Sequence, residues 1–230
     1  MDTFVSQQAF QDMRQSIVDG APETAARLAR EALEIGILPL DAINNGYVPG
    51  MHSVGEQFAQ HNMFLPDMMA SAEAMRAALE VIEPELKRMG TTRPVAGTVV
   101  LGTTRGDIHE IGKALVGTLL SANGFRVFDL GVDVAGETFA AKAREVHADI
   151  VGVSALLTTT MRNQKTVIEA LERVGLRSQV KVIVGGAPVT RAWAAEIGAD
   201  GYAKDAVSSV ELARSLMERK TTCVATENAP

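Results

Sequence analysis

The sequence is poor in several features that would each indicate a class of function. Among its 230 residues there is one cysteine, which excludes an internal disulfide, and no CxxC or cysteine-rich metal motif occurs. Aromatic residues make up 4%, which disfavours a surface that stacks nucleic-acid bases. Lysine and arginine number 22 against 28 acidic residues, and the net charge of −6 argues against nucleic acid or an anionic membrane as a partner.

Long apolar segments are also missing. No run approaches the roughly 18 apolar residues of a transmembrane helix, and the opening stretch MDTFVSQQAFQDM lacks the apolar segment of a signal peptide. We therefore expect a cytoplasmic protein without a membrane partner. The hydrophobic fraction of 47% is ordinary for a globular protein with a core, and the length allows one large domain or two small ones.

Residues 1–89 carry helical patterns and no convincing strand. In APETAARLAREALEIG and again in LPDMMASAEAMRAALEVIEPEL, apolar residues recur at the spacing of one helix face. The apolar residues of the stretch between them also recur at helical spacing, but Gly46, Pro49 and Pro66 are expected to interrupt the helix. These patterns predict a small helical bundle, of about four helices.

After a linker at 90–97, the pattern changes to short β-branched runs that alternate with helical stretches. Strands are predicted at 95–102, 125–131, 148–156 and 180–186, with a weak fifth at 200–204. Helices are predicted at 110–123, 136–147, 160–174, 190–198 and 205–219. This alternation predicts an α/β domain at 98–219, a doubly wound parallel sheet of the flavodoxin-like type. The polar residues 220–230 are expected to form a disordered tail.

Chemically distinctive residues follow the predicted strands. Ligands of open parallel sheets bind beyond the carboxyl ends of the strands, so these residues are candidates for a site. They include a histidine with an acid nearby, several hydroxyls and paired glycines: Asp107, His109 and Gly112 after the first strand, Ser154, Leu156, Thr158 and Thr160 after the third, Gly185 and Gly186 after the fourth, and Ala206 after the fifth.

Three nucleotide or phosphate sites fit this edge poorly. The turn GTTRGDIHEIG does not contain the GxGxxG of a dinucleotide site. In GDIHEIGKA, Ala114 stands where a Walker A loop needs a metal-binding hydroxyl, and Ser154 stands where a phospho-receiver needs an aspartate. Taken singly, each candidate also has an ordinary structural explanation: Asp107 as a helix N-cap, His109 as a surface residue, the glycines as turns and the methionine stripe as core.

Taken together and in order, the motifs resemble a known family. The pattern Asp-x-His-x-x-Gly, followed by Ser-x-Leu and Gly-Gly, resembles the signature of a cobalamin-binding domain. The stretch MHSVGEQFAQHNMFLPDMMASAEAM is similar to the helical cap of cobalamin-dependent methionine synthase and of stand-alone corrinoid proteins. The resemblance covers about residues 10–217 and is greatest to corrinoid proteins of methylamine, methanol, methoxyaryl and betaine methyltransferase systems. It implies a helical cap over 1–89 before the cobalamin-binding domain.

The resemblance also implies roles for individual residues. His109 would be the lower axial ligand of cobalt in place of the cofactor's own dimethylbenzimidazole, with Asp107 bonded to its other ring nitrogen and Thr160 extending that relay. Phe58, Leu65 and Met68 would form an apolar cap over the upper face. The implied contacts to the corrinoid are Gly106, Asp107, Ile108, His109, Gly112, Ser154, Leu156, Thr158, Gly185, Gly186 and Ala206.

The function implied is that of a methyl carrier, a corrinoid subunit and not a complete enzyme alone. It would accept a methyl group, as methyl-Co(III), from a substrate:corrinoid methyltransferase. A second methyltransferase would pass that group to a thiol or tetrahydrofolate, and a reductive activase is a further possible partner. The alternative is a cobalamin-dependent sensor, photoreceptor or regulatory protein, but those usually carry a DNA-binding module and a basic surface. The sequence identifies neither the methyl donor nor the acceptor.

Overall fold

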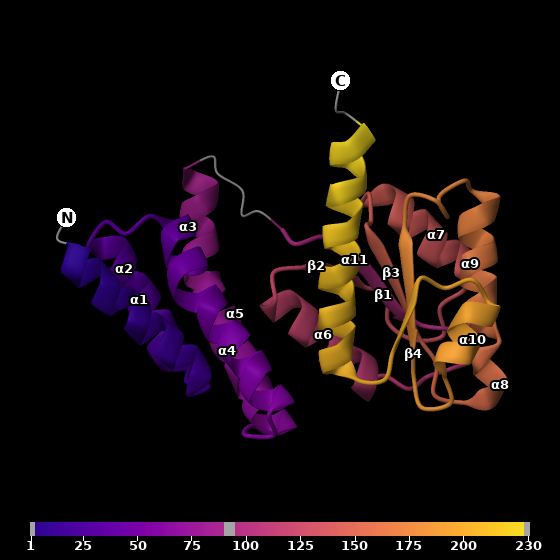
Figure 1. Cartoon of the computed structure of the whole chain (residues 1–230), viewed down its shortest axis with the longest axis horizontal. Helices are drawn as coiled ribbons and strands as arrows, with labels where there is room; N and C mark the ends of the chain where they lie inside the picture. The colour runs from indigo at the N-terminus through magenta and orange to yellow at the C-terminus, as the bar shows by residue number, and fades with distance from the viewer. Residues whose placement is uncertain (1–2, 90–94, 228–230) are drawn as a thin grey trace. The chain divides into compact units, whose positions relative to one another are not determined.

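A computed structural model of the chain describes residues 3–89 and 95–227 (Figure 1). The chain divides into two compact units, residues 1–94 and 95–230, the first helical and the second α/β. The division falls within the linker predicted at 90–97, of which residues 90–94 lie outside the described part. Across the described ranges, none of the helices combines the length and the apolar character that crossing a membrane requires.

The helical unit is built around a long amphipathic helix, α5. The predicted stripe on this helix is buried, from Met68 through Met75 to Ile82, and α2 packs along it with Ala25 and Ala29. The elements of the unit are α1 (Thr3–Val18), α2 (Pro22–Glu34), α3 (Pro39–Asp41), η1 (Ala42–Tyr47), α4 (Val48–Ala59) and α5 (Leu65–Arg88). The helical periodicity therefore predicted the core of this unit correctly.

Where the sequence predicted a break at Gly46 and Pro49, the chain stays helical. It passes through the π-helical segment η1 directly into α4, so Pro49 lies within a continuous helical stretch, shortly after the wider π turn. At Gly46 a side chain would come within 2.7 Å of the Met13 sulfur, so glycine permits the close approach to α1. The Tyr47 side chain is buried, and its hydroxyl donates a 2.9 Å hydrogen bond to the Ala25 carbonyl.

The α/β unit contains a five-stranded parallel sheet with the strand order β2-β1-β3-β4-β5. This order confirms the predicted doubly wound, flavodoxin-like sheet. The strands are β1 (Thr98–Thr103), β2 (Arg126–Asp129), β3 (Ile150–Ser154), β4 (Lys181–Gly185) and β5 (Gly201–Ala203). The helices are α6 (Ile111–Ala122), α7 (Gly136–Glu145), α8 (Thr158–Met161), α9 (Asn163–Arg173), α10 (Arg191–Glu196) and α11 (Ala206–Glu227).

Helices cover both faces of the sheet (Figure 1). Helices α7 and α9 pack together over one face, around a core that includes Val100, Phe139 and Val167. Helices α6 and α11 pack together on the other face. Because the chain leaves β1 toward one face and β3 toward the opposite face, the carboxyl ends of these two neighbouring strands form the topological switch point.

Strand register places the predicted site residues in a row. Thr103 of β1 is paired with Ser154 of β3, Ser154 with Gly185 of β4, and Gly185 with Ala203 of β5. Each of these residues lies at the carboxyl end of its strand. The segments that follow the strands, with the candidate site residues, therefore begin side by side at one edge of the sheet.

The C-terminal helix is longer than the sequence indicated. It was expected to end near residue 219 before a disordered tail, whereas α11 runs to Glu227 and residues 228–230 lie outside the described part. A helix that is already formed and packed gains one backbone hydrogen bond for each residue that it adds, and the unfavourable nucleation step is not repeated. Weak helix formers such as those in KTTCVAT can therefore continue it.

Candidate functional site

The first candidate segment is the non-helical stretch that joins β1 to α6. Gly106 has φ +80°, a left-handed conformation that glycine adopts without steric cost, and this turns the chain across the end of the sheet. The Thr103 hydroxyl donates to the His109 carbonyl at 2.9 Å. The segment is thereby held against β1, and Asp107 and His109 come from it.

Asp107 and His109 form a close pair. The distance between Nδ1 of His109 and Oδ1 of Asp107 is 2.6 Å, and the backbone N–H of His109 donates to the same oxygen at 3.1 Å. The Asp107 side chain has no exposed surface, while the imidazole is 45% exposed. Because an ionised carboxylate can only accept hydrogen bonds, the proton of a neutral imidazole resides on Nδ1. Nε2 of His109 then carries a free lone pair.

The second oxygen of Asp107 is bonded to the segment after β3. Oδ2 accepts from the Thr160 hydroxyl at 2.6 Å and from the backbone N–H groups of Leu156 and Leu157 at 2.8 and 3.3 Å. Burial by itself raises the pKa of Asp107, but the hydrogen bonds from Thr160, Leu156 and His109 outweigh it and hold that pKa well below its usual range. Asp107 therefore remains an anion throughout the physiological pH range.

Asp107, His109 and Thr160 are thus brought together in one hydrogen-bonded chain, from an exposed ring nitrogen to a buried hydroxyl. Oγ1 of Thr160 also lies 3.0 Å from the Leu157 carbonyl, and its single proton serves one acceptor at a time. The shorter contact is the one to Asp107. The sequence placed these residues after neighbouring strands, and the fold closes the 53-residue separation between Asp107 and Thr160.

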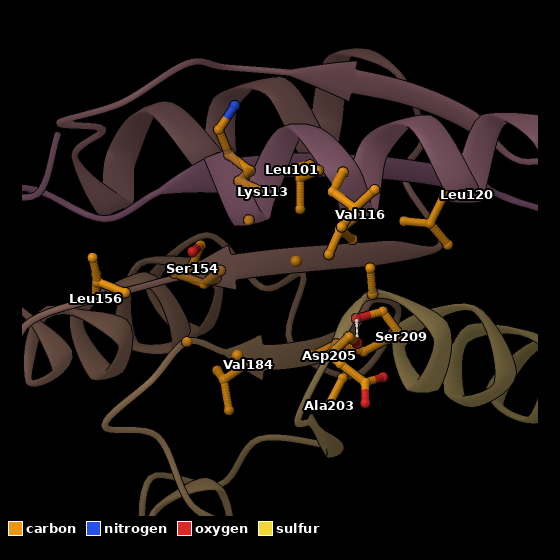
Figure 2. A pocket seen from close by; sticks show the side chains of 18 of the residues that line it. Leu101, Lys113, Val116, Leu120, Ser154, Leu156, Val184, Ala203, Asp205 and Ser209 are labelled. Carbon is orange, nitrogen blue, oxygen red and sulfur yellow. Dashed lines mark hydrogen bonds between the residues drawn. The ribbon is translucent and has the colours of Figure 1, made fainter. Parts of the chain in front are cut away.

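A cavity of about 710 Å³ opens beside His109, between α6, α11 and the sheet (Figure 2). Its size is that of a site for a drug-sized or larger ligand. Most of the predicted contact residues line it: Ile108, His109, Gly112, Ser154, Leu156, Gly185, Gly186 and Ala206. Gly106, Asp107, Thr158 and Thr160 are not part of the lining. Asp107 and Thr160 are buried behind His109, and Thr158 is exposed at the start of α8.

Three of the four predicted glycines line the cavity, and they differ in what they allow. A side chain at Gly186, where φ is +125°, would lie 1.7 Å from the Ala155 carbonyl oxygen, so this glycine is required by the protein's own backbone. At Gly185 a Cβ would come within 3.1 Å of the Ala203 carbonyl oxygen. A Cβ at Gly112 would meet no protein atom within 4 Å. Gly112 is therefore the position where a missing side chain leaves open space within the cavity lining.

The residues predicted as an apolar cap lie in the helical unit and differ in exposure. Leu65 is 40% exposed at the start of α5, and Phe58 is half-buried on α4. Met68 is 4% exposed and belongs to the buried stripe of α5. Leu65 has exposed apolar neighbours in Phe64 and Met69, which the sequence reasoning did not single out. An apolar helix pattern by itself does not distinguish a core residue from a surface residue of the same type.

Asp133 is a functional candidate that sequence reasoning missed. It has φ +54°, a left-handed conformation that is uncommon outside glycine but tolerated by aspartate. Its Oδ1 accepts the Gly106 N–H at 2.7 Å, and its own N–H donates to the Asp107 carbonyl at 2.9 Å. Asp133 therefore holds the segment that carries Asp107 and His109 from the loop after β2. Its position just beyond a strand end is the signal that could have identified it.

The start of α9 provides two further polar contacts to this edge. The Asn163 amide donates to the Arg105 carbonyl at 2.8 Å. The buried Gln164 amide donates to the carbonyls of Val153 and Gly185, at 3.0 and 3.1 Å, and so ties the ends of β3 and β4 together. The sequence gives little sign of these contacts, because a polar residue on a predicted helix is usually exposed.

Within residues 3–89 and 95–227, no three or more histidine, cysteine, aspartate or glutamate side chains are grouped so that they could hold a metal ion. At the sheet edge, Nε2 of His109 is a metal-binding donor beside the cavity. One such donor beside a large cavity is suited to a metal centre whose other ligands come with a prosthetic group.

Family models match both units of the chain. A B12-binding-domain model matches residues 97–211, and a second B12-binding-domain model matches residues 9–83. The first contains the parallel sheet with the Asp107–His109 pair and the cavity. The second covers most of the helical unit.

Several named proteins are similar to this chain, and their alignments cover nearly all of it. Trimethylamine corrinoid protein 1 of Methanosarcina acetivorans is 48% identical over 204 residues, which is 89% of this chain and 94% of the relative. A cobalamin-binding protein from Desulfitobacterium hafniense, solved by crystallography, is 31% identical with a TM-score of 0.71, covering 89% of this chain and 96% of that one. The methanol:cobalamin methyltransferase complex from Methanosarcina barkeri matches with 28% identity and a TM-score of 0.81, covering 95% of this chain and 85% of that one.

Proposed function

The chain belongs to the family of B12-binding corrinoid proteins, and we propose that it carries a methyl group on its corrinoid between two methyltransferases. The observation that carries the proposal is the 2.6 Å pair of His109 and Asp107, with Nε2 free at the mouth of a cavity of about 710 Å³. A corrinoid's cobalt can accept such a nitrogen donor, and the cofactor needs room for a large group beside it. The residues present therefore fit the cofactor of the family.

When bound, the corrinoid supplies a cobalt centre that can accept and release a methyl group. His109 would hold the cobalt through Nε2, in place of the cofactor's own base. Asp107 fixes the tautomer by accepting the Nδ1 proton, and Thr160 and the Leu156 N–H keep the Asp107 carboxylate ionised and oriented. The orientation of the ligand is thus determined before any metal bond forms.

The partners are part of the proposal. The relative named for trimethylamine and the match to a methanol methyltransferase complex support a separate substrate:corrinoid methyltransferase as the methyl source. A second methyltransferase would deliver the methyl group to a thiol or to tetrahydrofolate. A reductive activase would return oxidised, inactive cofactor to its active state. Phe58, Leu65 and Met68 of the helical unit are proposed to form an apolar shield for the methyl group.

The test is the visible spectrum of the full chain reconstituted with methylcobalamin. The wild-type protein is expected to show cobalt with a histidine as lower ligand, and His109→Ala is expected to lose or shift that spectrum. His147→Asn is the matched control, because His147 lies between α7 and β3, at the opposite edge of the sheet, and asparagine tolerates its left-handed φ of 50°.

Two outcomes would contradict the proposal. If the wild-type chain retains no cobalamin, the chain is not a corrinoid carrier. If His109→Ala and wild type bind cobalamin with identical spectra, His109 does not bind the cobalt.

A further inference from the structure

The segment between β1 and His109 turns on a glycine, the residue type with the most conformational freedom. Gly106 makes the left-handed turn, and its torsion angles determine the direction in which the chain continues to Asp107. The hydrogen bonds from the segment after β3 hold the carboxylate of Asp107, and the Thr103 hydroxyl holds the backbone at the His109 carbonyl. The position of Asp107 relative to His109 therefore also depends on what holds the backbone at Gly106 and Asp107.

Asp133, from the loop after β2, contacts the peptide groups on both sides of these two residues. Its Oδ1 accepts the Gly106 N–H at 2.7 Å, in the peptide group that precedes Gly106. Its own N–H donates to the Asp107 carbonyl at 2.9 Å, in the peptide group that follows Asp107. The torsion angles of Gly106 and Asp107 all lie between these two contacts, so one residue restricts them together.

The loop that carries Asp133 is itself anchored at two places. The Val134 N–H donates to the Thr103 carbonyl at 2.9 Å, so the loop is bonded to the end of β1. At the start of the loop, the Asp129 carboxylate pairs with the ammonium group of Lys113, whose side chain is fully buried in α6. Asp133 therefore extends from a support that is bonded to both elements that the candidate segment joins.

The backbone conformation of Asp133 indicates that its side chain is used. Its φ of +54° brings an L side chain close to its own backbone, so a glycine would adopt this conformation more easily. The same loop has a glycine at position 131, where φ is +83°. An aspartate in a conformation that favours glycine is an outlier from which a role of the carboxylate can be inferred. The contact with the Gly106 N–H is such a role.

We propose that Asp133 is a positioning residue for the cobalt-binding histidine, acting through the backbone of Gly106 and Asp107. The inference rests on the proposed function, because the histidine nitrogen concerned is the one that would bind cobalt. Without Asp133, Gly106 can change its torsion angles, and the 2.6 Å pair of Asp107 and His109 forms for a smaller part of the time. The Nδ1–H tautomer of His109, which leaves Nε2 available to a metal, is then populated less.

The experiment measures the tautomer of His109 in the full chain without cofactor. Nitrogen NMR of histidine-labelled protein is recorded at about pH 9, where a free imidazole is neutral, and His109→Ala identifies the signals among the four histidines. Asp133→Gly keeps the left-handed backbone and removes the acceptor. We expect it to lower the ratio of the Nδ1–H to the Nε2–H tautomer about threefold or more. In hydrogen exchange near neutral pH, the Gly106 amide should exchange about tenfold faster.

Two further variants serve as the rescue and the control. Asp133→Asn keeps an oxygen acceptor and tolerates the left-handed conformation, so it should restore the wild-type tautomer ratio. His147→Gly is the control, because His147 also has a left-handed φ, of 50°, and lies between α7 and β3, at the opposite edge of the sheet. It should leave the His109 tautomer unchanged. After reconstitution with methylcobalamin, the histidine-ligated fraction in the visible spectrum should rank the variants in the same order.

Each failure has a distinct outcome. An unchanged tautomer ratio in Asp133→Gly would overturn the inference, even if this variant were less stable, and so would an Asp133→Asn protein that behaves like Asp133→Gly. An equal change in His147→Gly would attribute the effect to any left-handed residue and not to the contact with Gly106. A lowered ratio with an unchanged spectrum of the reconstituted protein would show that Asp133 does not act on the cobalt ligand. If the wild-type chain binds no cobalamin, the proposed function fails whatever the tautomer ratio is.

Discussion

The helical unit and the α/β unit hold their candidate residues by different forces. In the α/β unit, the Asp107 carboxylate accepts five hydrogen bonds, which come from His109 and from the segment Leu156–Thr160. In the helical unit, the candidate residues are apolar and are covered by packing to different extents. Directional contacts specify the place of each atom, whereas packing specifies how much of a side chain is covered.

This difference determines what each unit reveals about function. The contacts of Asp107 define a charge, a tautomer and a free nitrogen at His109, and from these a chemistry follows. Met68 and Leu65 lie on the same helix with the same apolar character, and their exposed fractions of 4% and 40% separate a core residue from a surface one. We therefore expect substitutions of buried apolar residues in the helical unit to change stability alone. Substitutions around Asp107 in the α/β unit should also change the binding of cobalt by His109.

The largest effect is expected from Asp107→Ala. It leaves several buried donors without their acceptor, and the free energy of unfolding should fall by about 4 kcal/mol. The histidine-ligated spectrum should be lost with it. Denaturant unfolding and the spectrum of the reconstituted protein measure the two effects, with Asp12→Ala, an exposed aspartate of α1, as the control.

The difference in unfolding free energy between wild type and Asp107→Ala should depend on pH in a definite direction. Because folding lowers the pKa of Asp107, its stabilisation is complete above the unfolded pKa of about 3.9 and is lost as the pH falls toward the lower folded pKa. The gap in unfolding free energy between wild type and Asp107→Ala should thus be constant from pH 7 to about pH 5 and shrink below pH 4. A gap that widens on acidification would contradict the assigned ionisation.

The next largest effect is expected in the helical unit. Met75 is fully buried on α5, and Met75→Ala should lower the free energy of unfolding by about 3 kcal/mol through lost contacts and a cavity. It should leave the spectrum of His109-ligated cobalt unchanged. Met69→Ala, at 47% exposure on the same helix, is the control and should cost less than about 0.5 kcal/mol. A spectral change in Met75→Ala would show that the two units do not act separately.

A smaller effect is expected from Thr160→Val, which removes the hydroxyl that donates to Asp107 while keeping the shape. We expect a loss of about 1.5 kcal/mol in unfolding free energy and a weaker preference for the histidine-ligated form of the cofactor. Thr160→Ser keeps the donor and should restore both. If serine and valine behave alike, the Thr160 hydroxyl does not support the Asp107–His109 pair.

The smallest change in stability is expected from Leu65→Ala, about 0.5 kcal/mol or less, because Leu65 is a partly exposed residue at the start of α5. If Leu65 shields the methyl group as proposed, photolysis of bound methylcobalamin should become faster in this variant. Ile35→Ala, at 47% exposure after α2, is the control. An unchanged photolysis rate in Leu65→Ala would remove Leu65 from the shield.

Much of the fold and part of the candidate site could be predicted from local pattern. The period of apolar residues gave the buried stripe of α5, and the β-branched runs gave four of the five strands, because both patterns reflect how an element is covered. Placement after β1 singled out Asp107 and His109. Asp133 and Gln164 were missed, because nothing in their neighbourhood along the chain indicates that they hold a distant backbone segment.

The sequence by itself determined the order of the elements and the presence of Asp107 and His109 on the segment after the first strand. Only the tertiary structure decided that Oδ2 of Asp107 meets Leu156 and Thr160, 49 and 53 residues further along. It likewise decided that Gly186 is needed by the Ala155 carbonyl and that Lys113 turns its charge to Asp129. The physical reason is that periodicity encodes burial within one element, whereas hydrogen bonds between segments depend on strand order and register.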